Sequence, residues 1–581
     1  MLLTTLQKDR AAGVLLGQAI GDALGVPYEF ASRITAGEAR MVGGGLGPYA
    51  PGEWSDDTQM AVCIARVTAT GADLGTDAAL DAVAQAFLDW QARGASDIGA
   101  QTSTVLHAAR RGAGPLAQRM TAAALDAARA GRAGNGALMR TGVVGLVALE
   151  DAQATADAAR RVAALTHADD RCVDSCVLWS EAVRVAVMEG RLDVRAGLSL
   201  LPEERRSGWL ALIEEAEALP PATFGRNGYT VTAFQAAWSA IHATAHIEGP
   251  DHVEAALQTA IAIGHDTDTV AAITGALLGA RYGVSGLRTD LARRVHGWPA
   301  LPARDLIRLC LATATGGRPG AWPGAASMLR GDQRPLGLPH PDDHDVILGT
   351  EADLARCAEL GVTAVVSLSR VGAADIAAAG VQPGKHVEVW LVDSDDPDAN
   401  ADLAWTLEDV ARTIDHLRAD GERVLLHCVA AEHRTPAIAL AYSRYVGQTE
   451  RTAKRQIETL LRRRGQMGCL LWETAGRQAP AKHPASHDLA GALASYQAGR
   501  TSFERLKTVV RATHFTPRRH KPIMSLADLG EQWDYIPVQG SFWDTIGDAL
   551  FTDVLTKEQY DELFAIHQAQ LRGDASAEDK R

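Results

Sequence analysis

From about residue 5 to residue 315 the apolar positions of the chain recur at spacings of three and four. The stretches 79–88, 183–188 and 253–263 are examples, and the whole region is rich in alanine and leucine. Apolar residues at these spacings lie on one face of an α-helix, and short polar segments separate the repeats. The pattern therefore predicts an all-α domain over residues 1–315.

The pattern changes after a stretch dense in Gly and Pro, which predicts a linker over 316–341. Short β-branched runs then alternate with helical patterns, and this order is typical of an α/β domain with a largely parallel sheet, here over 342–474. The predicted strands are 346–349, 362–368, 387–392 and 424–427, and the predicted helices include 351–360, 403–418 and 436–445. A second linker, 475–489, and a mainly helical segment of unknown function, 490–581, complete this multidomain organisation.

Composition narrows the class of protein. At 581 residues the chain is too long for one hydrophobic core, and its net charge of −14 makes nonspecific nucleic-acid binding unexpected. Its 7 cysteines are an odd number and form no CxxC pair, which favours a reducing compartment. The apolar runs 13–25 and 271–283 are too short to span a membrane, and the start of the chain does not resemble a signal peptide. We expect a cytoplasmic protein without a membrane partner.

Two clusters of oxygen-bearing side chains stand at predicted helix starts, Ser55-Asp56-Asp57 and Asp266-Thr267-Asp268-Thr269. Such side chains also serve as helix N-caps, but a cap needs one acceptor and each cluster offers several. Carboxylate and hydroxyl oxygens are the ligands that Mg²⁺ and Mn²⁺ prefer. Two clusters in one helical domain therefore predict a two-metal hydrolytic site.

Other segments of the helical region add to this site. Glu29 follows Asp22 by seven positions, beyond a helix of small residues. The stretch 131–140 contains Asn135-Gly136 and places a donor-rich turn before a helix, which suits phosphate binding through backbone N–H groups. His167 precedes an acidic turn, although a single histidine is more often structural than functional.

Five segments, GQAIGDALGVPYEF, WSDDTQMAVCIA, GNGALMR, THADD and GHDTDTVAAITGALLGARYG, occur in this order. Together they resemble the ADP-ribosylglycohydrolase family over residues 8–312. The resemblance implies an all-α bundle with a binuclear Mg²⁺ or Mn²⁺ centre. The implied metal ligands are Ser55, Asp56, Asp57, Asp266, Asp268 and Thr269. It places Asp22 and Glu29 at the metal rim, where Glu29 handles the attacking water or gates the site, and Asn135, Gly136 and His167 along the ADP-ribose cleft.

The implied reaction is cleavage of the glycosidic bond between ADP-ribose and an acceptor, either a protein side chain or a small molecule. A water activated by the metals would attack the anomeric carbon, and nearby carboxylates would stabilise an oxocarbenium-like transition state. The sequence departs from the family at two positions. Ser55 stands where Thr is common and keeps the hydroxyl, whereas His265 replaces a frequent Gly and is expected to narrow the cleft.

The second domain has a candidate site of its own at Cys428-Val-Ala-Ala-Glu-His-Arg434-Thr435. A buried cysteine at a strand end is the plain alternative. Five residues between Cys428 and Arg434, however, can wrap backbone N–H groups around a phosphate at a helix N-terminus, which favours a thiolate nucleophile. Arg434 would hold phosphate oxygens, and Thr435 would assist the thiolate as leaving group.

This segment resembles the dual-specificity protein phosphatase family over residues 340–474. The resemblance implies a general acid on the loop about thirty residues before the cysteine, for which Asp396 is the first candidate and Asp393 the second. The loop departs from the family in carrying Ala431 and Glu432 where Gly is usual, and an acidic side chain beside an anion site weakens binding. An active phosphatase acting on a phosphorylated substrate is favoured over a site that only binds phosphate.

The leading hypothesis is a bifunctional enzyme that joins a metal-dependent ADP-ribosyl hydrolase to a cysteine-based phosphatase. One alternative is a protein that binds ADP-ribose without cleaving it, although a binding relic would not need to keep six oxygen ligands. Another alternative is an enzyme that processes phosphorylated ADP-ribose or ADP-ribosylated nucleic-acid ends, suggested only by the fusion of the two modules.

Overall fold

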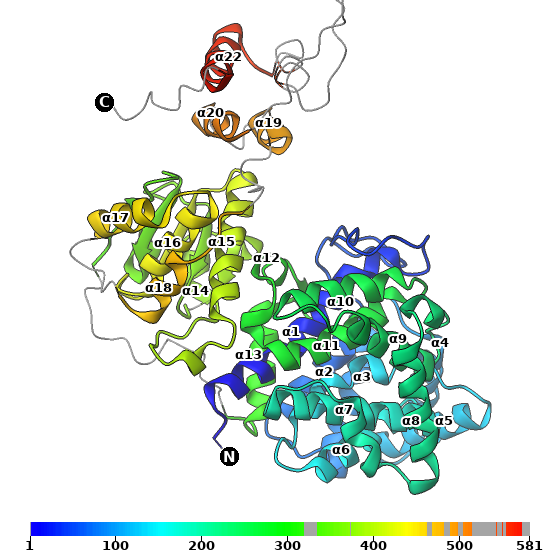
Figure 1. The fold of residues 1–581 in the computed structure, drawn as a ribbon. Coiled ribbons are helices and arrows are strands. Elements are labelled where there is room, and N and C mark those ends of the chain that lie inside the picture. The colour runs from blue at the N-terminus through cyan, green and yellow to red at the C-terminus, as the bar shows by residue number, and fades with distance from the viewer. Residues whose placement is uncertain are drawn as a thin grey trace, which may run out of the picture.

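The computed structural model describes residues 2–318, 334–371, 373–461, 468–481, 489–497, 503–513, 542, 546, 549 and 554–571. Figure 1 shows three successive parts along the chain: a helical domain, a sheet-containing domain and a small group of C-terminal helices. Residues 319–333 of the first predicted linker (316–341) and 482–488 of the second (475–489) lie outside the described residues.

The helical domain is built from helices joined by short loops, as the spacing of apolar residues predicts. Its longer helices are α1 (Thr5–Gly25), α2 (Asp56–Thr68), α3 (Asp77–Arg93), α4 (Ala100–Ala109), α5 (Leu116–Arg129), α6 (Ala152–Ala164), α7 (Asp170–Glu189), α8 (Glu203–Ala218), α9 (Thr230–Ala243), α10 (Asp251–Ala262), α11 (Thr267–Tyr282) and α13 (Ala303–Ala314). Short elements are α12 (Thr289–Ala292), the 3₁₀ turns η1 (Val26–Tyr28) and η6 (Val284–Gly286), and a two-stranded pair, β1 (His296–Gly297) and β2 (Leu301–Pro302). One continuous apolar core fills this domain.

Helices α1 and α11 form the centre of the helical domain. A Cβ atom added to Gly13, Gly17 or Gly21 of α1 would lie 2.1–2.3 Å from a backbone oxygen of α11. The partners run backwards along α11, from Gly279 to Gly275 to Ala271, so the two helices are antiparallel. Glycine at every fourth position thus lets the two backbones touch. This contact brings the end of α1 to the beginning of α11.

The second domain contains a mixed five-stranded sheet in the order β3-β4-β7-β5-β6. Its strands are β3 (Leu338–Pro339), β4 (Val346–Thr350), β5 (Ala364–Ser367), β6 (His386–Glu388) and β7 (Val424–Cys428). The last four are parallel, and β3 pairs antiparallel with β4 at the edge. The sheet is therefore largely parallel, with one short antiparallel edge strand that the apolar pattern did not predict.

Helices cover both faces of this sheet, because alternate strand residues point to opposite sides. On one face Val346, Val366 and Leu426 pack with α15 (Leu403–Ala419), α16 (Arg434–Tyr445), α17 (Glu450–Leu461) and α18 (Leu470–Gly476). On the other face Ile347 and Leu425 pack with η7 (Glu351–Arg356) and α14 (Ala373–Ala378).

The predicted helix 351–360 is shorter and tighter than expected. Only Glu351–Arg356 is helical, as the 3₁₀ turn η7, which begins with a capping box between Thr350 and Asp353. A glycine with left-handed backbone, Gly361 (φ 66°), ends the segment before β5. The segment is thus a short 3₁₀ turn followed by a glycine turn, a common form for a connector between two strands.

The described C-terminal helices are α19 (Leu489–Gln497), α20 (Phe503–Ala512) and α22 (Lys557–Leu571). Leu506, Val509, Phe542, Ile546 and Leu563 bury their side chains in a small core between them. The mainly helical character expected for 490–581 therefore holds where the structure describes this segment.

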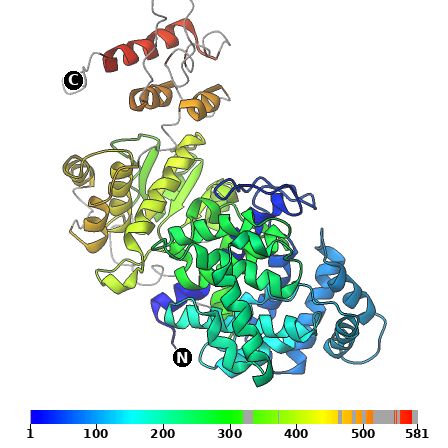
Figure 2. The same ribbon diagram turned by 45° about the vertical axis from the view of Figure 1, so that its right-hand side comes forward.

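The two larger domains share a polar interface. Asp409 of α15 accepts hydrogen bonds from the backbone N–H (2.8 Å) and the hydroxyl (2.7 Å) of Thr289 in α12. Figure 1 shows α15 on the side of the sheet domain that faces α12, and the domains stay side by side in the turned view of Figure 2. Among the described residues, no helix combines the length and the apolar character needed to cross a membrane.

Candidate active sites

Both oxygen clusters of the helical domain meet where α1 ends. Ser55 stands at the N-cap of α2 and Asp266 at the N-cap of α11. A Cβ atom on Gly25 would lie 2.5 Å from the Cα of Asp268, so the end of α1 touches the start of α11. Three helix ends that are far apart in sequence thus converge on one acidic site.

Asp22 of α1 fixes the position of α2. Its carboxylate accepts hydrogen bonds from the N–H of Ser55 (2.8 Å), the hydroxyl of Ser55 (2.9 Å) and the N–H of Thr58 (3.0 Å). Ser55 itself makes no side-chain capping bond to α2. The cap of α2 is therefore supplied by another helix, and the plain interpretation of Ser55 as a local helix cap is wrong.

Two overlapping sets of carboxylates lie at the centre of the site. Asp22, Asp57 and Asp268 form one set and Glu29, Asp266 and Asp268 the other, and within each set one carboxylate oxygen from each residue lies within 4.8 Å of the other two. Asp268 belongs to both. Among the described residues, the buried Oδ1 atoms of Asp57 and Asp268 have no hydrogen-bond partner. Buried carboxylates without donors are costly unless a cation compensates them, so this donor set fits a pair of divalent ions.

The electrostatics of the site agree with this need for positive charge. Burial and the neighbouring carboxylates raise the pKa of Asp57 and of Asp268 well above the usual range for aspartate. Burial, followed by repulsion from Asp266 and Asp97, raises the pKa of Glu29 to about 8, and burial raises the pKa of Asp22 to about 6.

A cavity of about 310 Å³ opens above these carboxylates, and Glu29, Asp56, Asp266, Asp268 and Thr269 border it. The predicted ADP-ribose-binding residues Asn135, Gly136 and His167 also line it, whereas Asp22, Ser55 and Asp57 lie beneath its surface. The volume is at the lower end of the range typical of small-molecule sites. The structure thus brings all the singled-out residues of the helical domain to one cavity or its floor.

The turn that carries Asp266 is held by two asparagines. The amide of Asn135 donates to the carboxylate of Asp266 (2.7 Å) and to the carbonyl of Asn227 (2.9 Å). Asn227 in turn accepts from the N–H of Asp266 (3.1 Å) and donates to the carbonyl of Gly264 (3.1 Å). Asn227 was missed in the sequence analysis, because a single Arg-Asn-Gly turn carries no signal of a distant partner.

His167 is a neutral member of the wall. Burial, together with the charge of Arg140, lowers the pKa of His167 to about 3. Its Nδ1 lies 2.8 Å from the hydroxyl of Thr166, which also accepts a hydrogen bond from the buried guanidinium of Arg140. The imidazole is therefore available to hydrogen-bond a polar ligand without carrying charge.

Two residues near the cavity rim were not predicted correctly: His265 was expected to narrow the cleft, and Asp97 was not predicted at all. His265 does not narrow the cleft: it is exposed, it is not part of the cavity wall, and its ring approaches Gly225 instead. Its left-handed backbone (φ 66°) turns the side chain outward at a position that favours glycine. Asp97, which no sequence pattern marked, contributes a carboxylate to the cavity wall.

Comparison with known proteins accounts for this half of the chain. A family model described as ADP-ribosylglycohydrolase matches residues 3–319, more than half of the chain. The chain belongs to the ADP-ribosylglycohydrolase family. An ADP-ribosylarginine hydrolase, Tri1, of Pseudomonas putida strain GB-1 is 29% identical over 300 residues, which are 49% of this chain and 74% of the relative. The ADP-ribosyl-[dinitrogen reductase] glycohydrolase of Rhodospirillum rubrum is 28% identical over 287 residues, 48% of this chain and 87% of the relative.

A solved structure titled ADP-ribosylglycohydrolase-related protein complex is also similar. It has a TM-score of 0.43 and 26% identity, and the match covers 54% of this chain and all (100%) of that chain. The ADP-ribosylglycohydrolase match ends at residue 319, before the sheet domain begins.

Beyond the ADP-ribosylglycohydrolase domain, the second candidate site lies between β7, which ends at Cys428, and α16, which begins at Arg434. Cys428 is buried, and Ala431 in the connecting loop has a left-handed backbone (φ 56°). The loop thus adopts a glycine-like conformation although glycine is absent. Within the described part of the chain, the buried hydroxyl of Thr435 has no hydrogen-bond partner.

The two candidate general acids occupy different positions. Asp393 faces the loop, with its Oδ1 3.0 Å from the Nδ1 of His433 and its Oδ2 3.6 Å from the Nε of Arg434. Asp396, the first candidate, is exposed and caps the short turn η9 (Pro397–Ala399) by accepting from the N–H of Asp398 (3.0 Å). Of the two carboxylates, Asp393 is therefore the one beside the cysteine loop, a distinction that depends on the course of the loop and not on its sequence.

Proposed function

We propose that the helical domain hydrolyses the N-glycosidic bond between ADP-ribose and an arginine side chain. The observation that carries this proposal is the pair of carboxylate sets that share Asp268 at the floor of a cavity. Family membership supports the reaction class, and a relative named as an ADP-ribosylarginine hydrolase supports the linkage. Asp97 in the cavity wall adds a carboxylate that can pair with a guanidinium.

In the proposed mechanism, Asp57, Asp266 and Asp268, with Ser55, Asp56 and Thr269, would hold two Mg²⁺ or Mn²⁺ ions. Bound there, these ions would supply Lewis-acid activation of a water and a hold on the distal ribose hydroxyls. Asn135 and Asn227 keep Asp266 in place, and Asp22 keeps the start of α2 in place.

The remaining steps fall to side chains at the cavity. Glu29, ionised once the two cations offset the surrounding carboxylates, receives the proton of the attacking water as the water oxygen bonds to the anomeric carbon and the carbon–nitrogen bond breaks. Glu29 then passes this proton to the guanidine nitrogen that leaves. Nearby carboxylates stabilise the positive charge that develops on the sugar, much as in glycosidases. Asp97 pairs with the guanidinium of the departing arginine, and His167 donates or accepts a neutral hydrogen bond along the wall.

The test is release of ADP-ribose from arginine-linked, serine-linked and nucleic-acid-linked substrates in Mg²⁺ or Mn²⁺. We expect the arginine-linked substrate to be cleaved, and Asp268→Asn to reduce the rate at least a hundredfold with the fold intact. Asp126→Asn, an exposed change on α5, is the control. Unchanged turnover of Asp268→Asn would refute the site, and tight binding without release would favour an ADP-ribose-binding protein.

We further propose that Cys428 is the nucleophile of a phosphatase. The supporting observation is the strand–loop–helix arrangement in which Arg434 and Thr435 open α16 directly after the cysteine loop. Arg434 would hold the phosphate, Cys428 would take the phosphoryl group, and Asp393 would give a proton to the leaving oxygen. Water would then release phosphate from the thiol.

The second proposal is tested with a generic aryl phosphate. Cys428→Ser is expected to abolish hydrolysis, whereas Cys469→Ser, a half-buried cysteine of the same domain, should leave it unchanged. Inorganic phosphate should protect Cys428 from alkylation. Protection without any hydrolysis by the natural sequence would identify a site that binds phosphate only.

A further inference from the structure

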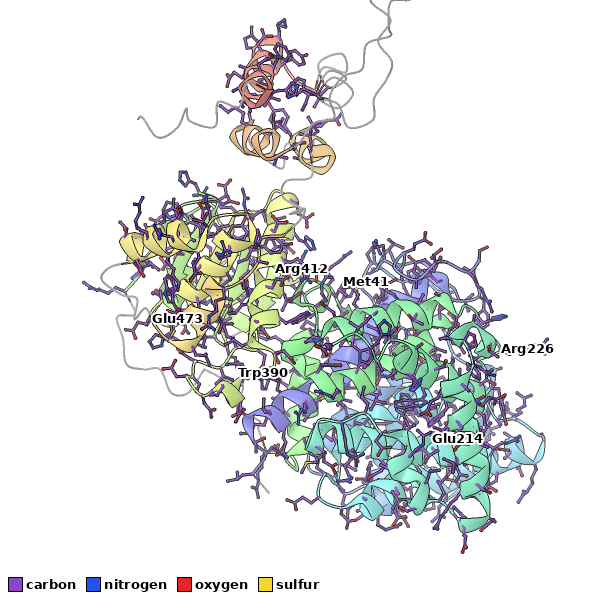
Figure 3. The ribbon with its side chains drawn as sticks, in the orientation of Figure 1. Met41, Glu214, Arg226, Trp390, Arg412 and Glu473 are labelled. Atoms are coloured by element: carbon purple, nitrogen blue, oxygen red, sulfur yellow. The ribbon has the colours of Figure 1, made fainter. Side chains whose placement is uncertain are left out.

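A cavity of about 260 Å³ lies between the helical domain and the sheet domain. The helical domain contributes Leu287, Pro302 and Ile307, and the sheet domain contributes Ile376, Val389 and Trp390. Trp390, labelled in Figure 3, lies where the two domains meet. Most of the wall is apolar, and cavities of this kind at domain boundaries are typical of small-molecule sites. This cavity is distinct from the one above Asp268.

The polar groups of this wall are almost all engaged with the protein itself. Arg304 pairs with Glu388 (2.6 Å), the hydroxyl of Thr406 donates to the carbonyl of Ser285 (3.2 Å), and Thr289 bonds to Asp409. Arg293 is the partial exception: its Nη1 donates to the carbonyl of Gly384 and its Nη2 lies 3.7 Å from the carboxylate of Asp420, but its buried Nε–H lacks an acceptor among the described residues. A buried donor without an acceptor calls for one from a ligand or water.

A chain of hydrogen bonds leads from this cavity to His427, whose Nδ1 lies 3.4 Å from the backbone carbonyl of Cys428. His386 lines the cavity, and its Nε2 lies 3.0 Å from the hydroxyl of Ser367. The same hydroxyl lies 2.7 Å from the Nε2 of His427, the residue before Cys428. These three side chains stand on adjacent strands β6, β5 and β7. Because one hydroxyl has one proton, a change of hydrogen bonding at His386 changes the tautomer that Ser367 supports at His427.

We propose that the cavity between the domains binds a small aromatic anion. We further propose that a ligand bound there changes the reactivity of Cys428 through His386, Ser367 and His427. The apolar wall takes the ring system, and Arg293 takes the anionic group. The proposed ligand site follows from the cavity and does not depend on the phosphatase function. The biological meaning of an effect on Cys428 does rest on that proposed function, but the effect itself can be measured as a change in cysteine reactivity.

Binding is tested on the full chain with the fluorescent probe 8-anilinonaphthalene-1-sulfonate, an aromatic ring system with one sulfonate. We expect one saturable site per chain. Ala303→Trp and Ala377→Trp, which fill the cavity from opposite domains, should raise Kd at least tenfold, and Arg293→Met at least fivefold. Ala122→Trp, an exposed change on α5, should leave Kd unchanged. Equal Kd values in all four variants, or no saturable binding, would overturn the ligand site.

Coupling is tested by the rate of Cys428 alkylation by iodoacetamide, followed by peptide mass mapping. Saturating probe should change this rate at least threefold in the natural sequence. Ser367→Ala should bind the probe equally well but lose the change, and Ser367→Thr, which keeps a hydroxyl, should restore it. Probe binding with an unchanged alkylation rate would refute the coupling. Absence of phosphatase activity would refute the proposed second function without touching either result.

Discussion

At the scale of single residues, Asn227 connects two turns of the ADP-ribosylglycohydrolase site. It is fully buried, and its side chain bridges the carbonyl of Gly264 and the N–H of Asp266, with the left-handed residues Gly264 and His265 in the same turn. A turn that bends in this way needs an outside support to keep one geometry. Asn227 therefore acts on the site through the position of Asp266.

Replacement of Asn227 by Ala should lower ADP-ribosyl hydrolysis at least tenfold and destabilise the fold by about 1–3 kcal/mol, because two buried backbone groups lose their partners. Asn400→Ala is the matched control, since Asn400 bonds in the same way to the N–H (2.9 Å) and the carbonyl (3.0 Å) of Val392 in the other domain. It should cost similar stability without affecting this hydrolysis. Equal activity loss in both variants would show that Asn227 acts only through stability.

Sequence patterns find residues whose chemistry is concentrated locally. Asp56, Asp57, Asp266 and Asp268 stand out because several oxygens occur within four positions at a helix start. Asn227 and Asp97 do not stand out, since each is an isolated polar residue whose meaning depends on chain segments that folding brings near. The choice between Asp393 and Asp396 likewise required the course of the loop.

At the scale of secondary-structure elements, the contact between α1 and α11 sets the geometry of the site. Both helices bear glycines where their backbones touch, and their adjoining ends carry Asp22 and Asp268. Side chains larger than hydrogen at these positions would separate the helices and so the two carboxylates. Close packing thus serves both stability and the site.

Replacement of Gly17 by Ala should destabilise the fold by about 1–3 kcal/mol, because the new methyl group would lie 2.3 Å from the carbonyl oxygen of Gly275. Gly208→Ala in α8 is the opposite case: nothing lies within 4 Å, so a gain of about 0.5–1 kcal/mol is expected from helix propensity. Urea unfolding measures both. A Gly17→Ala variant as stable as the natural sequence would contradict the close contact.

Asp9 makes the anchoring of α1 sensitive to pH. Its buried carboxylate accepts a hydrogen bond from the N–H of Ser285 (3.0 Å) in η6, and burial raises the pKa of Asp9 to about 7. The folded state then holds this proton more tightly than the unfolded state, whose aspartate titrates near pH 4. The contribution of Asp9 to stability is therefore present below about pH 4 and is lost as the pH rises to about 7.

Urea unfolding between pH 4.5 and 7.5 should show this dependence. In Asp9→Asn the side chain at position 9 cannot ionise. The free energy of unfolding of this variant should therefore fall less steeply with rising pH than that of the natural sequence, and the two slopes should differ by up to about 1.4 kcal/mol per pH unit. Asp126→Asn, at an exposed position, should run parallel to the natural sequence. Parallel curves for Asp9→Asn as well would show that Asp9 does not titrate in this window.

A helix or strand could be predicted from the sequence where its own side chains determine its secondary structure. The helix pattern of 403–418 and the strand pattern of 424–427 correspond closely to α15 and β7. Of the predicted strand 387–392, only Val387 and Glu388 are strand, as part of β6, because β6 pairs with the short β5 alone among the described strands. The edge strand β3 has two residues and depends on β4 for its existence, so its own sequence gives no strand signal.

At the scale of the whole molecule, the two larger domains meet through buried charges. Arg288 pairs with Asp290 (2.9 Å) and lies 3.6 Å from Asp409, while the Nδ1 of His416 lies 3.3 Å from Asp290. Apolar periodicity identified each domain but not this contact, because an interface depends on two surfaces whose polar residues look like solvent-exposed ones in sequence. Asp409 is only 1% exposed, so the domains are joined and not merely tethered.

This joint predicts that the two domains unfold together. Asp409→Ala removes the acceptor of both Thr289 donors and leaves Arg288 with one partner fewer, and loss of one partner of a buried ion pair costs about 3–5 kcal/mol. Calorimetry should therefore show one main transition for the natural sequence and an earlier, separate transition of the sheet domain in the variant. Glu408→Ala, on the same helix and in a half-exposed ion pair with Arg412, should change stability by less than about 0.5 kcal/mol. A single unshifted transition in Asp409→Ala would mean that the remaining contacts, such as Arg304–Glu388 and the apolar contacts around Trp390, couple the domains without Asp409. In that case the cavity between the domains would keep its shape without the Asp409 carboxylate.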